Sequence, residues 1–196
     1  SFDLSDLLGR RFDIERVRTV SMDGLILNLD QNKQKQWNAT TVLKSAGSPP
    51  ATSGGTFRGK ISASNATITA ATPDSRYVFK NVAGMLDFAQ YPDIAMDLKT
   101  QDGASILAVK GAWNFSGGGN LAVSAESIEP SSFATSVRLK GATSFQATIT
   151  GTTANPVAKG SFKLPAGSLA DMAVSNASGD FNYTNSTLSL ANTKLN

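Results

Sequence analysis

Residues 84–88 read Gly-Met-Leu-Asp-Phe, a glycine followed by large apolar residues two and four positions later. The same arrangement recurs at residues 111–115, 160–164 and 179–183. Alternation with a period of two places the apolar side chains on one face of a β-strand. A glycine at the first inward position permits a bend, a bulge or the close approach of a neighbouring backbone. The pattern predicts strands that share one bulky face.

The alternation extends outward from these four stretches over most of the chain. It is visible from Phe12 onward and returns near the end, where Leu188 and Leu190 lie two residues apart. Turn sequences such as Tyr91-Pro92-Asp93 and the glycines at residues 117–119 separate the alternating runs. The intervals suit strands of about 5–8 residues. The sequence therefore predicts an all-β protein.

Three segments depart from the alternation. Residues 3–8 (Asp-Leu-Ser-Asp-Leu-Leu) predict a short amphipathic helix that ends at Gly9. Residues 45–55 are rich in Ser, Gly and Pro and predict a loop. Pro130 suits the first position of a second short helix, over residues 130–136. Apart from these segments, residues 1–196 are expected to form a single β-rich unit, a segment of a longer protein.

The composition narrows the class of protein. Charged residues make up 17% of the chain, below the ~25% typical of soluble domains. The net charge is +3, and near the start of the chain Arg10 and Arg16 are interspersed with Asp13 and Glu15. No basic stripe is left to contact phosphates, so we expect no binding of nucleic acid.

The residue types needed for most catalytic sites are missing. The chain contains no histidine and no cysteine, which excludes disulfides, thiolate metal sites and a Ser-His-Asp triad. Asp87, Asp93, Asp97 and Asp102 lie in expected strands and turns without the spacing of a calcium-binding loop. No stretch approaches the ~20 apolar residues of a membrane-spanning helix. We expect no enzymatic activity, no cofactor and no metal.

The second half of the chain resembles a known family. Residues 151–156 read Gly-Thr-Thr-Ala-Asn-Pro and precede the glycine-led strands that begin at Gly160 and Gly179. This order is similar to the TamB/AsmA-like family, which repeats a strand ending in Gly-Thr, then Asn-Pro, then a glycine-led strand. Residues 121–151 also resemble that family's arrangement of strand, short helix and strand. The resemblance is good over residues 105–196 and only general before them.

The resemblance implies both a fold and a function. Members of this family are periplasmic proteins of diderm bacteria, anchored in the inner membrane. They form elongated, curled, largely antiparallel sheets, called β-tacos, with an apolar concave groove. They are implicated in phospholipid transport between the two membranes, and TamB also in outer-membrane protein assembly. The expected partners are phospholipid acyl chains and, through a region outside this segment, an outer-membrane assembly protein.

The residues expected to line such a groove occupy the inward positions of the alternating runs. A bulge shifts the alternation by one residue, so each assignment depends on where bulges fall. The expected lining consists of Ile61, Ile68, Leu86, Phe88, Ile94, Met96, Leu98, Leu107, Val109, Trp113, Phe115, Leu121, Val123, Phe145, Ile149, Phe162, Leu164, Phe181, Tyr183, Leu188 and Leu190.

Two other interpretations explain the same apolar face. It can be the closed core of a β-sandwich or barrel, since exposed apolar patches beyond a few hundred Å² are rare unless they bind something. Alternatively, the chain is an adhesin or autotransporter-passenger β-domain that binds by its outer surface. A closed, filled interior favours that second function, and an uncovered inner face favours the groove.

Overall fold

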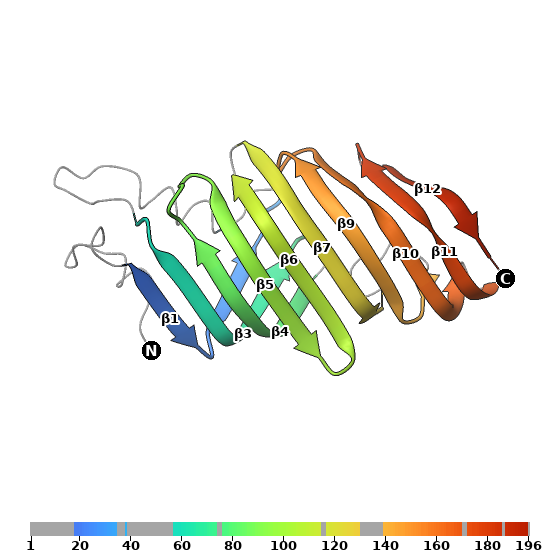
Figure 1. Ribbon diagram of the computed structural model, residues 1–196, viewed down its shortest axis with the longest axis horizontal. Helices are drawn as coiled ribbons and strands as arrows, with labels where there is room; N and C mark the ends of the chain where they lie inside the picture. Colours follow the sequence, from blue (N-terminus) through green and yellow to red (C-terminus); the bar gives the residue numbers. More distant parts are fainter. Residues whose placement is uncertain are drawn as a thin grey trace.

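A computed structural model describes residues 18–34, 38, 57–73, 76–114, 117–129, 139–169, 172–185 and 187–195. These residues form one sheet of twelve strands, whose main path runs β1-β3-β4-β5-β6-β7-β9-β10-β11-β12 (Figure 1). Beside this path, β2 pairs with β3 and β8 pairs with β10. β1 and β2 are parallel to β3, and all other paired strands are antiparallel.

The prediction of an all-β fold with a curled, largely antiparallel sheet is confirmed. Both predicted short helices and the loop at residues 45–55 lie outside the described residues. The strands are β1 (Thr19–Asp23), β2 (Ile26–Asp30), β3 (Lys60–Ala71), β4 (Arg76–Asp87), β5 (Ile94–Asp102), β6 (Ser105–Asn114), β7 (Gly118–Ile128), β8 (Leu139–Lys140), β9 (Thr143–Gly151), β10 (Pro156–Leu169), β11 (Met172–Thr184) and β12 (Thr187–Lys194).

Several strands are longer than the alternation predicts. The runs around Ile61 and Ile68 belong to a single strand, β3, which has 12 residues. β4, β10 and β11 have 12, 14 and 13 residues. Strands of this length do not stay flat, because each strand twists and a regular sheet accumulates the twist. Interruptions inside these strands therefore decide the shape of the sheet.

The interruptions are residues with a positive φ in the left-handed region. Non-glycine residues rarely adopt this conformation, but asparagine tolerates it better than most. Asn81 donates from Nδ2 to the carbonyl of Gln101 (3.1 Å), and Ser105 donates from Oγ to the carbonyl of Ser127 (2.9 Å). Gln101 pairs with Ile106, the residue after Ser105, so the interruptions at residues 81 and 127 lie at one level of the sheet. The residues, with φ between 48° and 68°, are Gly24 between β1 and β2, Asn65 in β3, Asn81 in β4, Ser127 in β7, Asn176 in β11 and Asn192 in β12. We call this line the crease.

The crease keeps apolar residues on one side of each strand. The register of β3 against β4 shifts between Ala63 and Ala66, as expected for a bulge with one extra residue. If the same residues formed a regular strand without the bulge, Ile68 would share a face with Ser62 rather than with Ile61. The sheet is most buried along the crease, since the residues that follow four of its six members are only 1–6% exposed: Ala66, Val82, Ile128 and Ala177.

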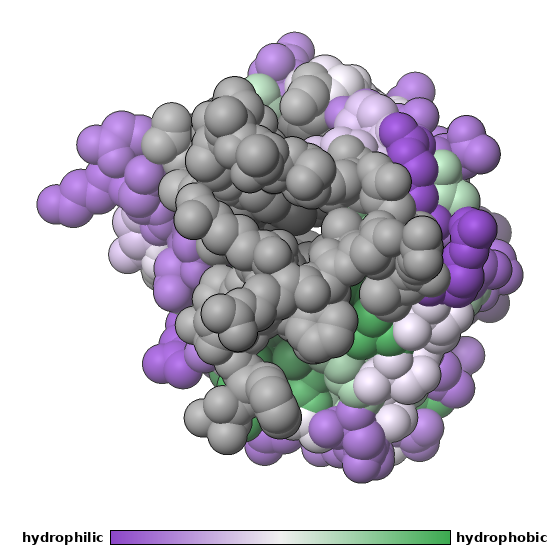
Figure 2. All heavy atoms as spheres, turned by 90° about the vertical axis from the view of Figure 1, so that its left-hand side faces the viewer, coloured by the Kyte–Doolittle hydropathy of each residue, from purple (hydrophilic) through white to green (hydrophobic). Residues whose placement is uncertain are grey.

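The sheet folds back on itself at the crease. In Figure 1 the blue strand β2 lies behind the front layer formed by the middle strands. Figure 2 looks along the sheet from its β1 end, with hydrophilic residues around the outside and hydrophobic residues toward the middle, where the grey residues leave it in view. The face that carries the buried residues is therefore the inner face of the curl.

The left-handed conformation of Asn81 yields a direct prediction. Asn81→Val is expected to lower the free energy of unfolding by about 1–2 kcal/mol relative to Asn81→Gly, because a β-branched residue disfavours positive φ. Both variants lose the side-chain hydrogen bond to Gln101, so their difference isolates the backbone conformation. Urea unfolding of the two proteins measures it, and equal stabilities would show that residue 81 is not held in the left-handed region.

At the β1 edge, the carboxylate of Asp23 is hydrogen-bonded to two residues at the crease of β3. Asp23 accepts hydrogen bonds from Ser64 Oγ (2.6 Å) and Asn65 Nδ2 (2.9 Å). These two bonds, the one from Ser64 first, lower the pKa of Asp23 below its ordinary value of 3.8. The carboxylate thus ties β1 to the bulge of β3.

Because of these hydrogen bonds, the thermal stability of the chain is expected to fall at acidic pH. Because the folded pKa is depressed, the contribution of Asp23 is present above 3.8 and is lost as the pH falls through the lower folded value. We expect the Tm of the unchanged chain to exceed that of Asp23→Ala at neutral pH, and the difference to shrink as the pH falls below 3.8. Thermal unfolding monitored by circular dichroism measures both, and a difference that does not vary with pH would contradict the prediction.

Candidate functional site: the inner apolar face

The inner face is organised in rows that cross the sheet from strand to strand. One row joins, through successive Cα partners, Val20, Ile61, Leu86, Met96, Gly111, Leu121, Ile149, Ala158, Tyr183 and Leu188. The next row joins Met22, Ala63, Gly84, Leu98, Val109, Val123, Ala147, Gly160, Phe181 and Leu190. Neither row contains Asp, Glu, Lys or Arg.

The expected lining residues that lie in described strands all fall on this face. Phe145 and Phe162 are direct partners, as are Ile94 and Trp113. Phe88 follows β4, and its ring centroid lies 5.5 Å from that of Phe57. Phe115 lies outside the described residues.

Beyond the crease, Ile68 is an expected lining residue, but its neighbours on the inner face were not predicted from the sequence. There Leu27 pairs with Ile68, which pairs with Phe79, and Leu29 reaches Tyr77 through Ala70 in the same way. Residues 24–30 are too continuously apolar for alternation to assign a face. The sequence feature that marks the crease is an asparagine at the point where the apolar alternation shifts by one residue, as at Asn65 and Asn81.

Burial on the inner face is uneven. Among the described residues, eight apolar side chains are buried, and several of them lie at the crease. Leu164 is 0% exposed, whereas Leu188 and Leu190 are 47% and 51% exposed. Met96, Leu98, Val109 and Val123 are half-buried, although they lie in the middle of the sheet. The face is therefore sealed at the crease and only partly covered along the middle strands.

Glycines let neighbouring strands come close together on the inner face. A Cβ on Gly111 would lie 2.2 Å from the carbonyl oxygen of Asn120, and one on Gly160 would lie 2.0 Å from that of Gln146. Both glycines begin the repeated motif, so the motif marks places where neighbouring backbones leave no room for a side chain. Above Gly160, the rings of Phe145 and Phe181 meet edge to face, with centroids 6.3 Å apart.

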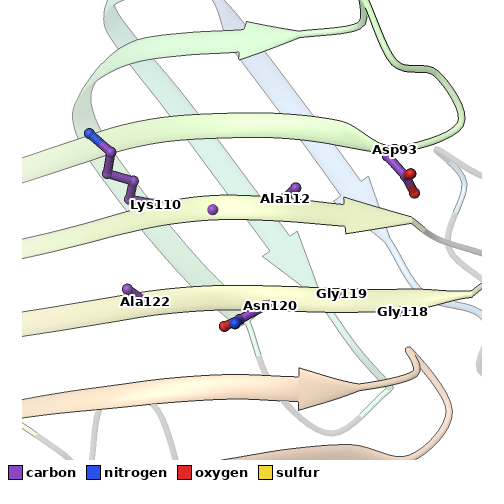
Figure 3. Close-up of a pocket in the computed structure, with 8 residues that line it drawn as sticks. Asp93, Lys110, Ala112, Gly118, Gly119, Asn120 and Ala122 are labelled. Atoms are coloured by element: carbon purple, nitrogen blue, oxygen red, sulfur yellow. The ribbon is translucent and has the colours of Figure 1, made fainter.

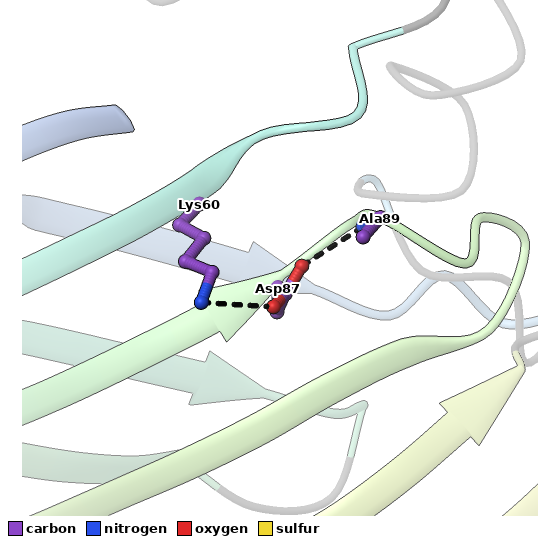
Figure 4. A network of polar contacts seen from close by, with 3 residues as sticks. All are labelled: Lys60, Asp87 and Ala89. Atoms are coloured by element: carbon purple, nitrogen blue, oxygen red, sulfur yellow. Dashed lines mark hydrogen bonds and ion pairs between the residues drawn. The ribbon is translucent and has the colours of Figure 1, made fainter. Parts of the chain in front are cut away.

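The outer face is polar and carries exposed ion pairs. Lys110 Nζ lies 2.8 Å from Asp97, which raises the pKa of the lysine. Asp87 accepts a hydrogen bond from the backbone N–H of Ala89 (2.9 Å) and lies 3.4 Å from Lys60 Nζ (Figure 4). The Ala89 bond, followed by the Lys60 contact, lowers the pKa of Asp87. Exposed pairs of this kind contribute little to stability.

The outer face also has two shallow depressions. One is lined by small residues of β6 and β7 such as Ala112 and Ala122, with Lys110 and Asp93 at its border (Figure 3). The other lies over β6 to β10, between Asp97 and Asp180. Among the residues that the structure describes, no three Asp or Glu side chains gather as a metal site would require. The extended apolar surface of the inner face is therefore the candidate site.

Comparison of the chain with protein-family models, curated proteins and solved structures finds no match. Within the described residues, no helix is both long and apolar enough to cross a membrane.

Proposed function

We propose that this chain is a segment of a hydrophobic conduit for phospholipid transport between the inner and outer membranes, in a TamB/AsmA-like protein. One observation supports the proposal: two rows of the inner face run without a charged residue from β1 to β12, and over the central strands their side chains are only half-buried. The protein is then periplasmic and anchored to the inner membrane of a diderm bacterium. A link to outer-membrane protein assembly belongs to the same proposal.

The physical properties of this face suit acyl chains. Each methylene group that leaves water for an apolar surface contributes about 0.8 kcal/mol. Val109 and Val123 offer hydrocarbon at neighbouring positions of one row, and Leu98 extends it by a strand. An acyl chain can therefore move along a row from strand to strand without meeting one site much tighter than the next. Such movement requires no catalytic group.

Crosslinking from adjacent residues tests the proposal. A photoreactive amino acid at Leu98, on the inner face, is expected to yield phospholipid adducts when the chain is in the periplasm of a diderm bacterium. The same amino acid at Lys99, which is exposed on the outer face, is expected to yield few. Mass spectrometry of the purified adducts identifies the lipid.

The same crosslinking distinguishes the conduit from an adhesin-like domain and from nonspecific contact with membranes. Adducts with proteins or glycans from Lys99, and none with lipid from Leu98, would support an adhesin-like domain that binds by its outer face. Phospholipid adducts of equal yield at both positions would indicate nonspecific contact with membranes. Either result would overturn the conduit.

A further inference from the structure

The two charge-free rows of the inner face contain one side chain with an oxygen or nitrogen atom, that of Tyr183 on β11. The nearby rings of Phe145 and Phe181 have no polar atom, and Trp113 uses its own within the protein, donating from Nε1 to Thr153 Oγ1 (3.2 Å). No described residue is hydrogen-bonded to the hydroxyl of Tyr183, and its oxygen is not buried. The hydroxyl is therefore open to a ligand that lies on the rows.

Tyr183 lies where the apolar lining ends. Its partners are Ala158 on β10 and Leu188 on β12, and Leu188 is 47% exposed. Two residues before Ala158, β10 begins at Pro156, which pairs with Gly151. The next row toward this rim of the sheet therefore has only a proline and a glycine there, and residues 151–155 are exposed.

The same rim is covered by bulky side chains at β5 and β6. Ile94 pairs with Trp113, and the two are only 5% and 7% exposed. Trp113 pairs with Gly119, which pairs with Gly151, so the buried pair and the bare end belong to one row. The rim is thus closed beside β6 and open beside Tyr183.

A tyrosine suits a boundary between apolar surface and water, because its ring is apolar and its hydroxyl donates a hydrogen bond. In a phospholipid this boundary is formed by the ester groups, which join the acyl chains to glycerol. Their carbonyl oxygens accept hydrogen bonds. Acyl chains that lie on the two rows would bring these oxygens to the end of the lining.

We propose that the hydroxyl of Tyr183 donates a hydrogen bond to an ester carbonyl oxygen of a phospholipid whose acyl chains lie on the two rows. The polar part of the lipid then leaves the inner face beside β11. This inference rests on the proposed function and adds to it the contact with the polar part of the lipid. One neutral hydrogen bond changes a Kd by about 2–10-fold, so a lipid held there can still move on.

Two short-chain phosphatidylcholines test the contact, one with ester and one with ether linkages, because the ether lipid lacks the carbonyl oxygens. Isothermal titration calorimetry with the purified chain, below the concentration at which micelles form, measures both Kd values. The unchanged chain is expected to bind the ester lipid about 2–10-fold more tightly. Tyr183→Phe is expected to bind the ester lipid as weakly as the ether lipid, with an unchanged Tm, because no hydrogen bond within the described residues is lost.

Tyr77→Phe is the matched control. Tyr77 lies on the inner face across the crease, and the substitution removes the same oxygen from the same kind of ring. Both Kd values are expected to stay unchanged. If Tyr77→Phe weakens the ester lipid as much as Tyr183→Phe does, the assignment to Tyr183 is wrong.

The remaining outcomes separate this contact from the conduit. Equal Kd values for the two lipids, unaffected by Tyr183→Phe, would refute the contact and leave the conduit standing. If Tyr183→Phe weakens both lipids equally, the hydroxyl contacts a phosphate oxygen, and the ester assignment is wrong. A lower Tm for Tyr183→Phe would mean that the hydroxyl is bonded within the chain, which also refutes the contact. If neither lipid binds, the conduit fails and the contact fails with it.

Discussion

Leu164→Ala is expected to lower the free energy of unfolding by about 2–5 kcal/mol, the range for a fully buried leucine whose surroundings collapse only partly. Leu164 is 0% exposed and pairs with Ala177, the residue that follows Asn176 in the crease. Its side chain lies against Gly141 and Gly167, which cannot extend a side chain into the vacated space. Urea unfolding of the purified chain, followed by tryptophan fluorescence, measures the loss.

Leu190→Ala is the matched control for Leu164→Ala. Leu190 lies on the same inner face but is 51% exposed, so its truncation is expected to cost less than about 1 kcal/mol. Similar losses at the two positions would mean that the inner face is covered evenly. That result would place the stability of the fold in a closed core and not at the crease.

Leu107→Asp is expected to abolish most of the phospholipid adducts formed from Leu98 while leaving the chain folded. Leu107 pairs with Thr100, two residues from Leu98 on the same face, and is half-buried. Water can reach a carboxylate at this position, so we expect a cost of about 1 kcal/mol, or roughly 2–4 °C in Tm. The charge nevertheless stands in the path of the acyl chain. Crosslinking yield and thermal unfolding of the same variant measure the two effects.

Ser124→Asp provides the corresponding control on the outer face. Ser124 is exposed and lies on β7, so a carboxylate there is expected to change neither the Tm nor the adducts. If Leu107→Asp unfolds the chain, the position is sealed from water, because a buried unpaired charge costs several kcal/mol. The inner face would then be a core, and the conduit would be refuted.

If the conduit is correct, the inner face stabilises the fold at the crease and contacts lipid along the middle of the rows. The crease collects Ala66, Val82, Ile128 and Ala177, whose burial stabilises the curl. Away from the crease, the side chains of the rows are only half-buried, and in the proposed conduit this part of the face would contact the lipid. A substitution at the crease should therefore change folding, and one in the middle of a row should change binding.

The class of fold follows from local pattern alone. Alternation assigns Leu86, Met96 and Val109 to one side of their strands, because a strand turns its side chains to opposite faces with a period of two. The glycine-led motif correctly marks close backbone approach at Gly111 and Gly160. The absence of histidine and cysteine excludes the corresponding chemistry whatever the fold.

The position of the crease follows only from the tertiary structure. A left-handed asparagine such as Asn65 or Asn81 resembles any other polar residue in an alternating run, and its conformation is stabilised by a neighbouring strand. The alignment of Gly24 with Asn192 depends on every pairing between the two edges of the sheet. Alternation therefore determined which residues share the apolar face of each strand. Strand pairing alone determined where that face bends and how much of it stays uncovered, because both depend on contacts between residues far apart in the chain.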